Sequence, residues 1–306
     1  MNNNYSFFKV SDGQSLAYKV WDEVDSPKGT VIIVHGMAEH IERYEETATY
    51  LNSQGLIVYG TDQRGHGKTP GRKGFFTSKN GWSRVIRDQV EFYNFVKEKT
   101  PTSNISYIAH SMGSYITRAM LSMEELEVER LILSGTGFES GFTTNTARLL
   151  AGIIGKFKGI TTDGILLDKI MNNPFAESIK DPLTKFDWLS RDNNIVSKYI
   201  NDSNCGFICT NQFFKDFLKI VTIACNKNKI KNINKTLPIL LYSGECDPVG
   251  GKDLSGVKKL KAIYDKLGLN VTMAINPGGR HESLNETNKD EVFKYFAEFL
   301  LGVKQN

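Results

Sequence analysis

The feature that most constrains this chain is an apolar run that ends at His110-Ser111 and is followed at once by a helical pattern. The run from Ser106 to Ala109 is typical of a strand, and the residues from Tyr115 to Met120 repeat at helical spacing. Ala109 and Gly113 lie two positions to either side of Ser111. Such a turn needs small residues there, because a larger side chain would collide where strand and helix pack together. We therefore predict a sharp strand–turn–helix with the Ser111 hydroxyl exposed at its apex.

Strand and helix patterns alternate along most of the chain. Residues 5–22 alternate like a hairpin at the edge of a sheet. Short buried strands are expected at 30–34, 55–59, 106–109, 130–134, 237–242 and 271–275, and helices at 81–99, 252–267 and 288–301. This order predicts an α/β protein with a mostly parallel sheet covered by helices on both faces. In such sheets ligands bind at the carboxyl ends of the strands.

The alternation of strand and helix patterns stops between residues 135 and 236, where no comparable buried strand is expected. Helical patterns at 147–157, 165–171 and 213–223 fill this stretch, and we expect most of their apolar faces to pack on the body of the protein. We interpret 1–134 and 237–306 as one core domain. Residues 135–236 are interpreted as a helical cap, or lid, inserted over the site.

Composition excludes several classes of protein. A net charge of +4 over 306 residues, with most lysines next to acidic residues, argues against a nucleic-acid partner. The start Met1–Ser6 lacks the basic and apolar parts of a secretion signal, and no run of 18 apolar residues occurs. The four cysteines lack the paired spacing of a metal site, which suggests reduced thiols. We expect a cytoplasmic protein, possibly peripheral at the membrane.

A serine hydroxyl is a weak nucleophile and needs a base that is itself oriented by a carboxylate. Of the five histidines, only His281 lies in a loop after a late strand, and Asp247 lies in the turn after the preceding strand. The order Ser111, Asp247, His281 is the nucleophile–acid–base order of α/β-hydrolases. Glu245 is a rival carboxylate; Asp247 is preferred because Pro248 fixes the backbone after it, although geometry must decide.

Ester chemistry also needs backbone N–H groups that stabilise the oxyanion. One donor is expected at Met112, directly after the nucleophile. The other is expected in the loop after the 30–34 strand, at Met37.

Three motifs resemble the monoacylglycerol lipase and lysophospholipase group of serine hydrolases, and the similarity extends from about residue 5 to 301. They are His35-Gly-Met-Ala-Glu-His40 with Arg43-Tyr44, Asp62-Gln-Arg-Gly-His-Gly67 and His110-Ser-Met-Gly113. Segments 186–192 and 202–207 resemble the cap of bacterial members. One departure is Ala109, where the family usually has glycine; a methyl group is the smallest possible intrusion, so we expect the turn to survive.

The resemblance implies the α/β-hydrolase fold, a glycerol ester with one long acyl chain as substrate, no metal and no organic cofactor. It also implies the triad Ser111, Asp247 and His281. By the same resemblance His35 and Gly36 shape the oxyanion loop and Arg64 and His66 brace the neighbouring loop, while His110 and Gly113 flank the nucleophile.

The sequence thus predicts a serine hydrolase that cleaves lipid-type carboxylic esters, either monoacylglycerols or lysophospholipids. A short-chain carboxylesterase would use the same residues and differ in pocket length. A peptidase is a further alternative, although no acidic cluster for a substrate amine is evident in the cap. A non-catalytic ligand-binding protein of this fold is the alternative from another class. The expected partner is a small lipid ester, with transient membrane contact through the cap.

Overall fold

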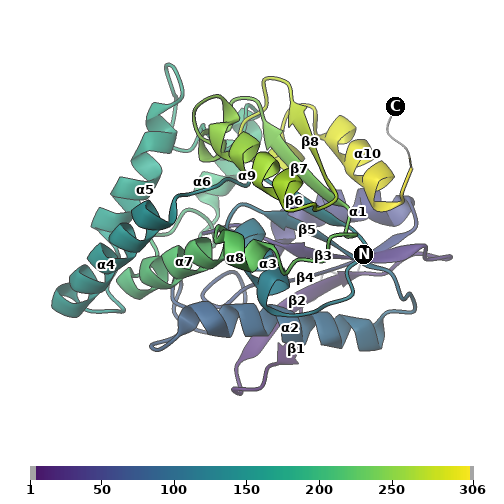
Figure 1. Cartoon of the computed structure of the whole chain (residues 1–306), viewed down its shortest axis with the longest axis horizontal. Helices are drawn as coiled ribbons and strands as arrows, with labels where there is room; N and C mark the ends of the chain where they lie inside the picture. The colour runs from purple at the N-terminus through teal and green to yellow at the C-terminus, as the bar shows by residue number, and fades with distance from the viewer. Residues whose placement is uncertain (1–4, 304–306) are drawn as a thin grey trace.

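The computed structural model describes residues 5–303, and its centre is an eight-stranded sheet in the order β1-β2-β4-β3-β5-β6-β7-β8 (Figure 1). The strands β1 and β2 form the hairpin at one edge, and β2 pairs antiparallel with β4. All other neighbours are parallel. The bounds are β1 Ser6–Lys9, β2 Ser15–Trp21, β3 Gly29–Val34, β4 Leu56–Thr61, β5 Ile105–His110, β6 Leu131–Ser134, β7 Ile239–Gly244 and β8 Val271–Asn276.

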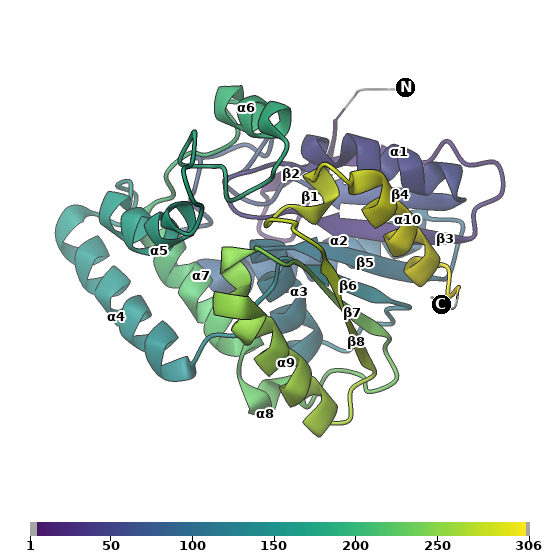
Figure 2. The same ribbon diagram turned by 90° about the horizontal axis from the view of Figure 1, so that it is seen from above.

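Helices cover both faces of this sheet (Figure 2). One face is buried by α1 (Glu45–Ser53) and α10 (Lys289–Leu300), which contribute Leu51 and Phe296 to its apolar core. The other face is buried by α2 (Gly81–Lys99), α3 (Met112–Met123) and α9 (Ser255–Lys266). Four short 3-10 turns, at Ile41–Tyr44, Pro248–Gly250, Lys252–Leu254 and Ser283–Asn285, complete this part of the chain. The predicted fold class, a mostly parallel sheet with helices on both faces, is confirmed.

Five helices lie between β6 and β7. They are α4 (Gly141–Lys158), α5 (Ile165–Glu177), α6 (Asn193–Asn201), α7 (Asn211–Ala224) and α8 (Lys227–Ile230). The sequence patterns located α4, α5 and α7 but placed the ends of α4 and α5 too far inward. They missed the short helices α6, of nine residues, and α8, of four, although Ile195, Val196, Tyr199 and Ile200 of α6 lie at helical spacing.

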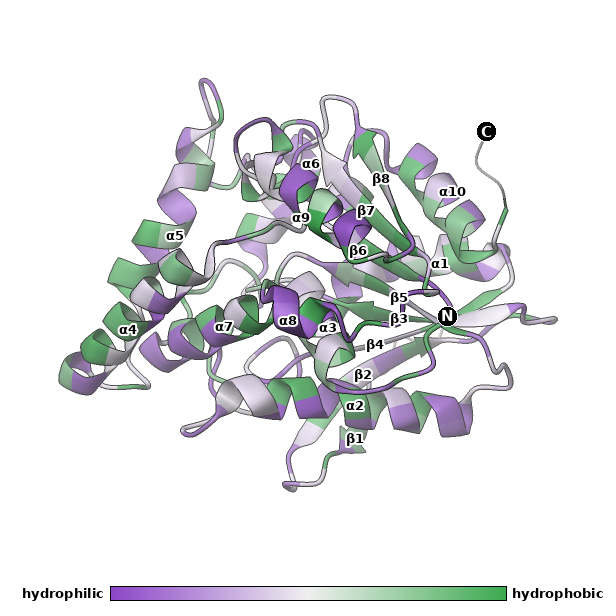
Figure 3. Ribbon diagram, in the orientation of Figure 1, coloured by the Kyte–Doolittle hydropathy of each residue, from purple (hydrophilic) through white to green (hydrophobic). Residues whose placement is uncertain are grey.

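The packing of α4 differs from our expectation that its apolar face packs on the body. Helix α4 packs against α7, and Ala151 and Gly155 are among its few buried residues. The large apolar side chains Leu149, Ile153 and Phe157 are 66%, 48% and 81% exposed instead. Figure 3 shows hydrophobic residues along the outside of α4 and α5. An exposed apolar surface of this kind usually marks a site that contacts another molecule or a membrane.

Within residues 5–303, no helix combines the length and apolar character needed to cross a bilayer. The four cysteines lie in this range as free thiols, and only Cys246 is exposed.

Candidate active site

Ser111 lies at the apex of the turn between β5 and α3, with φ of 50° and ψ of −119°. Residues other than glycine rarely adopt this backbone conformation, so the surrounding structure must stabilise it at Ser111. The Ser111 N–H donates to the carbonyl of Ser134 on β6 at 2.9 Å. The Ser111 carbonyl accepts hydrogen bonds from the N–H and hydroxyl of Ser114, at 2.9 and 2.6 Å. Hydrogen bonds to both the N–H and the carbonyl of Ser111 therefore stabilise its strained backbone.

Gly113 permits α3 to approach the sheet closely. A Cβ atom at this position would lie only 2.2 Å from the carbonyl oxygen of Val34 at the end of β3, and no side chain fits there. Ala109 is fully buried in β5, and its methyl group is accommodated within the sheet. The small residues that the turn needs are thus present on both sides of Ser111.

Asp247 and His281 meet at the carboxyl ends of β7 and β8. His281 Nδ1 lies 2.9 Å from Asp247 Oδ1, and both side chains are buried. Glu245 is exposed and accepts the N–H of Gly278 at 2.7 Å instead. Of the two carboxylates that the sequence left open, Asp247 is therefore the one that contacts the imidazole.

Burial alone would lower the pKa of His281. The negative charge of Asp247 and its hydrogen bond outweigh burial and raise the pKa of His281 above its ordinary value. The same hydrogen bond orients the ring, because a carboxylate at Nδ1 accepts a hydrogen bond from the N–H there, so Nε2 carries no proton and can take one.

Ser111 and His281 line the same cavity. Within residues 5–303 no hydrogen bond joins the Ser111 hydroxyl to the imidazole, a common finding in ligand-free hydrolases whose catalytic contacts tighten around substrate. Sequence reasoning missed Trp188, whose carbonyl accepts the His281 N–H at 3.2 Å and whose ring centroid lies 5.0 Å from the imidazole. No local signal marks Trp188, because its contact spans the chain from the cap to the loop after β8.

The N–H groups of Met37 and Met112 point to no acceptor within residues 5–303, and both residues line the cavity. By contrast, the N–H of Gly36 donates to Glu39 Oε1 at 2.5 Å. A Cβ atom on Gly36 would lie 3.2 Å from the Cβ of Ser111, so glycine lets this loop approach the nucleophile candidate. The role of these two N–H groups as oxyanion donors stays a prediction.

His35 is fully buried and ties this loop to its neighbour. Its Nε2 accepts the N–H of Gln63 at 3.0 Å, so the proton must lie on Nδ1, which bonds to the Gly36 carbonyl at 2.8 Å. Burial lowers the pKa of His35 to about 3 and keeps the ring neutral. His35 therefore shapes the Gly36 loop without carrying charge.

Arg64, His66 and His110 lie around the site. The Arg64 guanidinium binds Asp88 at 2.5 Å and Asp12 at 2.7 Å, away from the cavity. His66 bonds to the Arg64 carbonyl at 2.9 Å, and its buried ring, with a pKa lowered to about 3, packs against His35. Burial also lowers the pKa of His110, to about 4; its ring centroid lies 4.7 Å from that of His281.

A buried ion network beside the site was not expected from the sequence. The Arg43 guanidinium binds Glu39 at 2.6 Å and Glu282 at 2.7 and 2.5 Å, and stacks over the Tyr199 ring of the cap at 4.8 Å. Tyr44 donates to Glu39 at 3.0 Å. The four-residue spacing of Glu39 and Arg43 is a possible local signal, but nothing near Glu282 predicts its partner.

The cavity has a volume of about 630 Å³, within the range of pockets that enclose small ligands. Residues 135–236 supply most of its wall through apolar side chains, among them Ala147, Ile165, Leu167, Phe207, Phe217 and Val221. Among residues 135–236, the carboxyl groups of Glu139 and Asp168 also line it, and burial raises the pKa of each.

The sheet order and the turn at Ser111 define an α/β-hydrolase fold. The model of the family described as serine aminopeptidase, S33 matches residues 25–288, and the chain belongs to this family.

Several characterised relatives are similar over part of the chain. It is 28% identical to the monoacylglycerol lipase of Mycolicibacterium smegmatis over 174 residues, which cover 56% of this chain and 61% of that protein. It is 26% identical to human monoglyceride lipase over 242 residues, covering 78% and 71%. The chain spans less than two thirds of the first of these. The resemblance to monoacylglycerol lipases is confirmed.

A solved structure is similar over the whole chain. It is a thermostable carboxyl esterase from Bacillus coagulans in complex with glycerol, with a TM-score of 0.89, 28% identity and 98% coverage of both chains.

Proposed function

We propose that this protein is a serine hydrolase of lipid-type carboxylic esters, with monoacylglycerols or lysophospholipids as substrates. The observation that supports this most directly is one apolar cavity lined by Ser111 and by a histidine bonded to Asp247. The similarity to monoacylglycerol lipases points to the same substrate class.

In the proposed mechanism, His281 takes the proton from Ser111 as Oγ attacks the ester carbonyl carbon. The N–H groups of Met37 and Met112 stabilise the oxyanion of the tetrahedral intermediate. His281 then protonates the leaving alcohol, and the acyl group remains on Ser111. A water molecule, deprotonated by His281, attacks this acyl ester, and the fatty acid leaves as the proton returns to Ser111. Asp247 stabilises the imidazolium in both halves.

We propose that residues 135–236 act as a cap domain on a core formed by 1–134 and 237–306. The cap supplies the apolar wall of the cavity, which suits an acyl chain and excludes water from the acyl-enzyme. Its contact with the core includes Trp188 against His281. Removal of this wall would leave the acyl chain in water.

Substitution of Ser111 by alanine tests the chemistry. We expect Ser111→Ala to lower kcat by about 10⁴-fold or more, because the variant keeps the oxyanion donors and the pocket but loses the proposed nucleophile. The thermal unfolding midpoint should change little, and a fluorophosphonate probe should label the wild type but not the variant. Near-normal turnover by the variant would refute the proposal, and an unlabelled wild type would favour the non-catalytic alternative.

A short-chain carboxylesterase is the second candidate, and the similarity to the esterase from Bacillus coagulans favours it. Acyl length separates the two functions, because each methylene buried in the cavity adds about 0.8 kcal/mol. We expect kcat/KM for p-nitrophenyl esters to rise from two carbons to at least eight. A maximum at two to four carbons would favour the carboxylesterase.

An aminopeptidase is the third candidate, because Glu139 and Asp168 could receive a substrate amine. Hydrolysis of aminoacyl p-nitroanilides faster than of the esters would favour it.

We further propose that the exposed apolar face of α4 contacts lipid surfaces. In vesicles of phosphatidylcholine and phosphatidylglycerol, the combined change Leu149→Gln, Ile153→Gln and Phe157→Gln should weaken co-sedimentation at least about tenfold, since each side chain loses its apolar burial. Phe7→Gln is the matched control, because Phe7 is 57% exposed on the distant edge strand β1. Equal effects of both changes would argue against a lipid contact through α4.

A further inference from the structure

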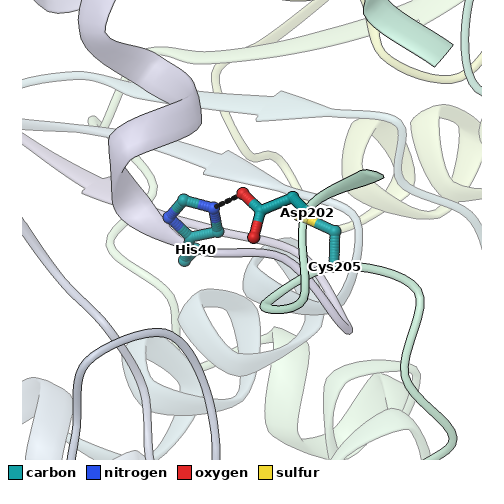
Figure 4. A group of neighbouring side chains, drawn as sticks. All are labelled: His40, Asp202 and Cys205. Carbon is teal, nitrogen blue, oxygen red and sulfur yellow. Dashed lines mark hydrogen bonds and ion pairs between the residues drawn. The ribbon is translucent and has the colours of Figure 1, made fainter. Parts of the chain in front are cut away.

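His40, Asp202 and Cys205 form a group of potential metal ligands outside the cavity (Figure 4). One ligand atom from each lies within 4.8 Å of the other two. His40 Nε2 and Asp202 Oδ2 are 2.7 Å apart. His40 comes from the loop after β3, whereas Asp202 and Cys205 follow α6 in the cap.

Backbone contacts hold the three residues in place. The N–H of Cys205 donates to the Asp202 carbonyl at 2.9 Å, and the N–H of Asn204 donates to Asp202 Oδ1 at 2.7 Å, which forms a tight turn. The N–H of Gly206 donates to the carbonyl of Ala38 at 2.9 Å and fixes this turn to the His40 loop. Both sides of the group are therefore organised before any ligand binds.

Two atoms of the group lack partners. His40 is 5% exposed, and its Nδ1 is buried without a hydrogen bond. Cys205 is 8% exposed, and within residues 5–303 no hydrogen bond reaches its sulfur. Glu42 Oε2 lies 3.9 Å from His40 Nδ1 on a side chain that is one-third exposed, and its other oxygen lies 3.9 Å from Lys19 Nζ. Histidines that bind metals commonly donate their second N–H to such a carboxylate.

We propose that His40, Asp202 and Cys205 bind a zinc ion that links the cap to the loop after β3. Imidazole, carboxylate and thiolate together are a donor set that suits Zn²⁺. Tetrahedral bonds of about 2.0 to 2.3 Å place ligand atoms about 3.5 Å apart. Zinc would therefore replace the hydrogen bond between His40 Nε2 and Asp202 Oδ2, which must separate from 2.7 Å, while atoms up to 4.8 Å apart must approach by about 1 Å. Water would fill the fourth position.

The bound ion would act on the neighbouring loop. His40 follows Met37 by three residues, so zinc would hold the loop of the proposed oxyanion donor to the cap. The binding itself does not depend on the proposed hydrolase activity.

Several charged groups surround the three residues. The Arg43 guanidinium and the carboxylates of Asp202, Glu39 and Glu282 lie near the Cys205 thiol, and Glu42 faces His40. The negative groups outnumber the one guanidinium, which favours a cation here.

Cobalt binding tests the site, because Co²⁺ can replace Zn²⁺ and its absorption spectrum depends on the ligands that bind it. After treatment with a chelator, the full chain titrated with Co²⁺ should show visible bands of tetrahedral cobalt and a near-ultraviolet thiolate-to-cobalt band that saturates at one equivalent. Added Zn²⁺ should abolish both bands. Cys205→Ser should lose the thiolate band, and Asp202→Asn should weaken binding at least tenfold. Cys246→Ser and Cys209→Ser are matched controls that should keep it.

Folding of each variant is checked by circular dichroism. If Cys205→Ser fails to fold, Asp202→Asn decides, because its side chain is one-third exposed. Zn²⁺ should also raise the thermal unfolding midpoint of the wild type and not that of Asp202→Asn. The proposal is overturned if the wild type gives no thiolate band, if the band persists in Cys205→Ser, or if it disappears in Cys246→Ser.

Discussion

At the scale of single residues, the site depends on a few contacts that stabilise a strained backbone at Ser111 and a buried imidazole at His281. Ser111 has a strained backbone that Ser134 and Ser114 support. His281 is buried, yet Asp247 favours its charged form. Each of these states would be costly alone, and each is stabilised by a partner from a different segment of the chain.

The raised pKa of His281 predicts a pH dependence of ester hydrolysis. A general base must be neutral, so kcat/KM should fall as the pH drops through the His281 pKa, with a midpoint above 6.5. Burial lowers this pKa, and Asp247→Asn removes the largest of the charges that raise it, leaving those of Glu282 and Glu39. The midpoint of the residual activity should therefore move to lower pH.

This profile is measured with a neutral ester across the stable pH range. Glu245→Gln is the matched control and should leave the midpoint unchanged, because Glu245 contacts Gly278 instead of the imidazole. A midpoint that moves equally in both variants would contradict the assignment of Asp247.

At the scale of elements, glycines in two helices have opposite roles. Gly113 in α3 lies so close to the end of β3 that a Cβ atom would meet the Val34 carbonyl at 2.2 Å. Gly152 and Gly155 in α4 have room, since their nearest neighbours would lie 3.7 and 3.6 Å from a new Cβ. The first glycine permits close packing, whereas the other two only weaken their helix.

Alanine substitutions should separate these roles. Gly152→Ala and Gly155→Ala should each raise the free energy of unfolding by about 0.5 to 1 kcal/mol, because alanine loses less backbone entropy in a helix. Gly113→Ala should lower it, because α3 must move away from the sheet. Denaturant unfolding measures all three, and stabilisation by Gly113→Ala would show that α3 is not packed as described.

At the scale of the whole molecule, Arg43 joins parts of the chain that are far apart in sequence. It binds Glu39 from the loop after β3 and Glu282 from the loop after β8, and it packs on Tyr199 of the cap. Burial alone would raise the pKa of Glu39, but the Arg43 charge outweighs this and lowers it. Glu39 therefore contributes stability above its unfolded pKa near 4.5, and this contribution is lost as the pH falls through its lower folded pKa.

Arg43→Met should destabilise the protein by about 3 to 5 kcal/mol at neutral pH, because two buried carboxylates lose their partner. Without Arg43 burial raises the Glu39 pKa, so the deficit should shrink as the pH falls toward 5. Arg72→Met is the matched control; the exposed pair of Arg72 and Asp163 should contribute no more than about 1 kcal/mol. A deficit that is independent of pH would argue against this network.

Much of the core could be predicted from local pattern. The apolar runs before Gly36 and Ser111 are buried strands, and the spacing from Val85 to Val96 is a helix, because the periods of strand and helix appear directly in the apolar residues. The prediction was weaker in the cap. There α6 shows its helical period over only nine residues, and the apolar face of α4 gave no indication of whether anything covers it.

The sequence by itself determined the alternation of strands and helices, the turn at Ser111, and the order in which Ser111, Asp247 and His281 follow one another. These features depend on residues that are close in sequence and on the rule that the carboxyl ends of parallel strands lie at one edge of the sheet. Only the tertiary structure decided that Asp247 and not Glu245 contacts His281, that Arg43 pairs with Glu282, and that Phe157 faces outward. Contacts between distant segments depend on the direction in which each loop leaves its strand, and that direction is set by packing and not by local pattern.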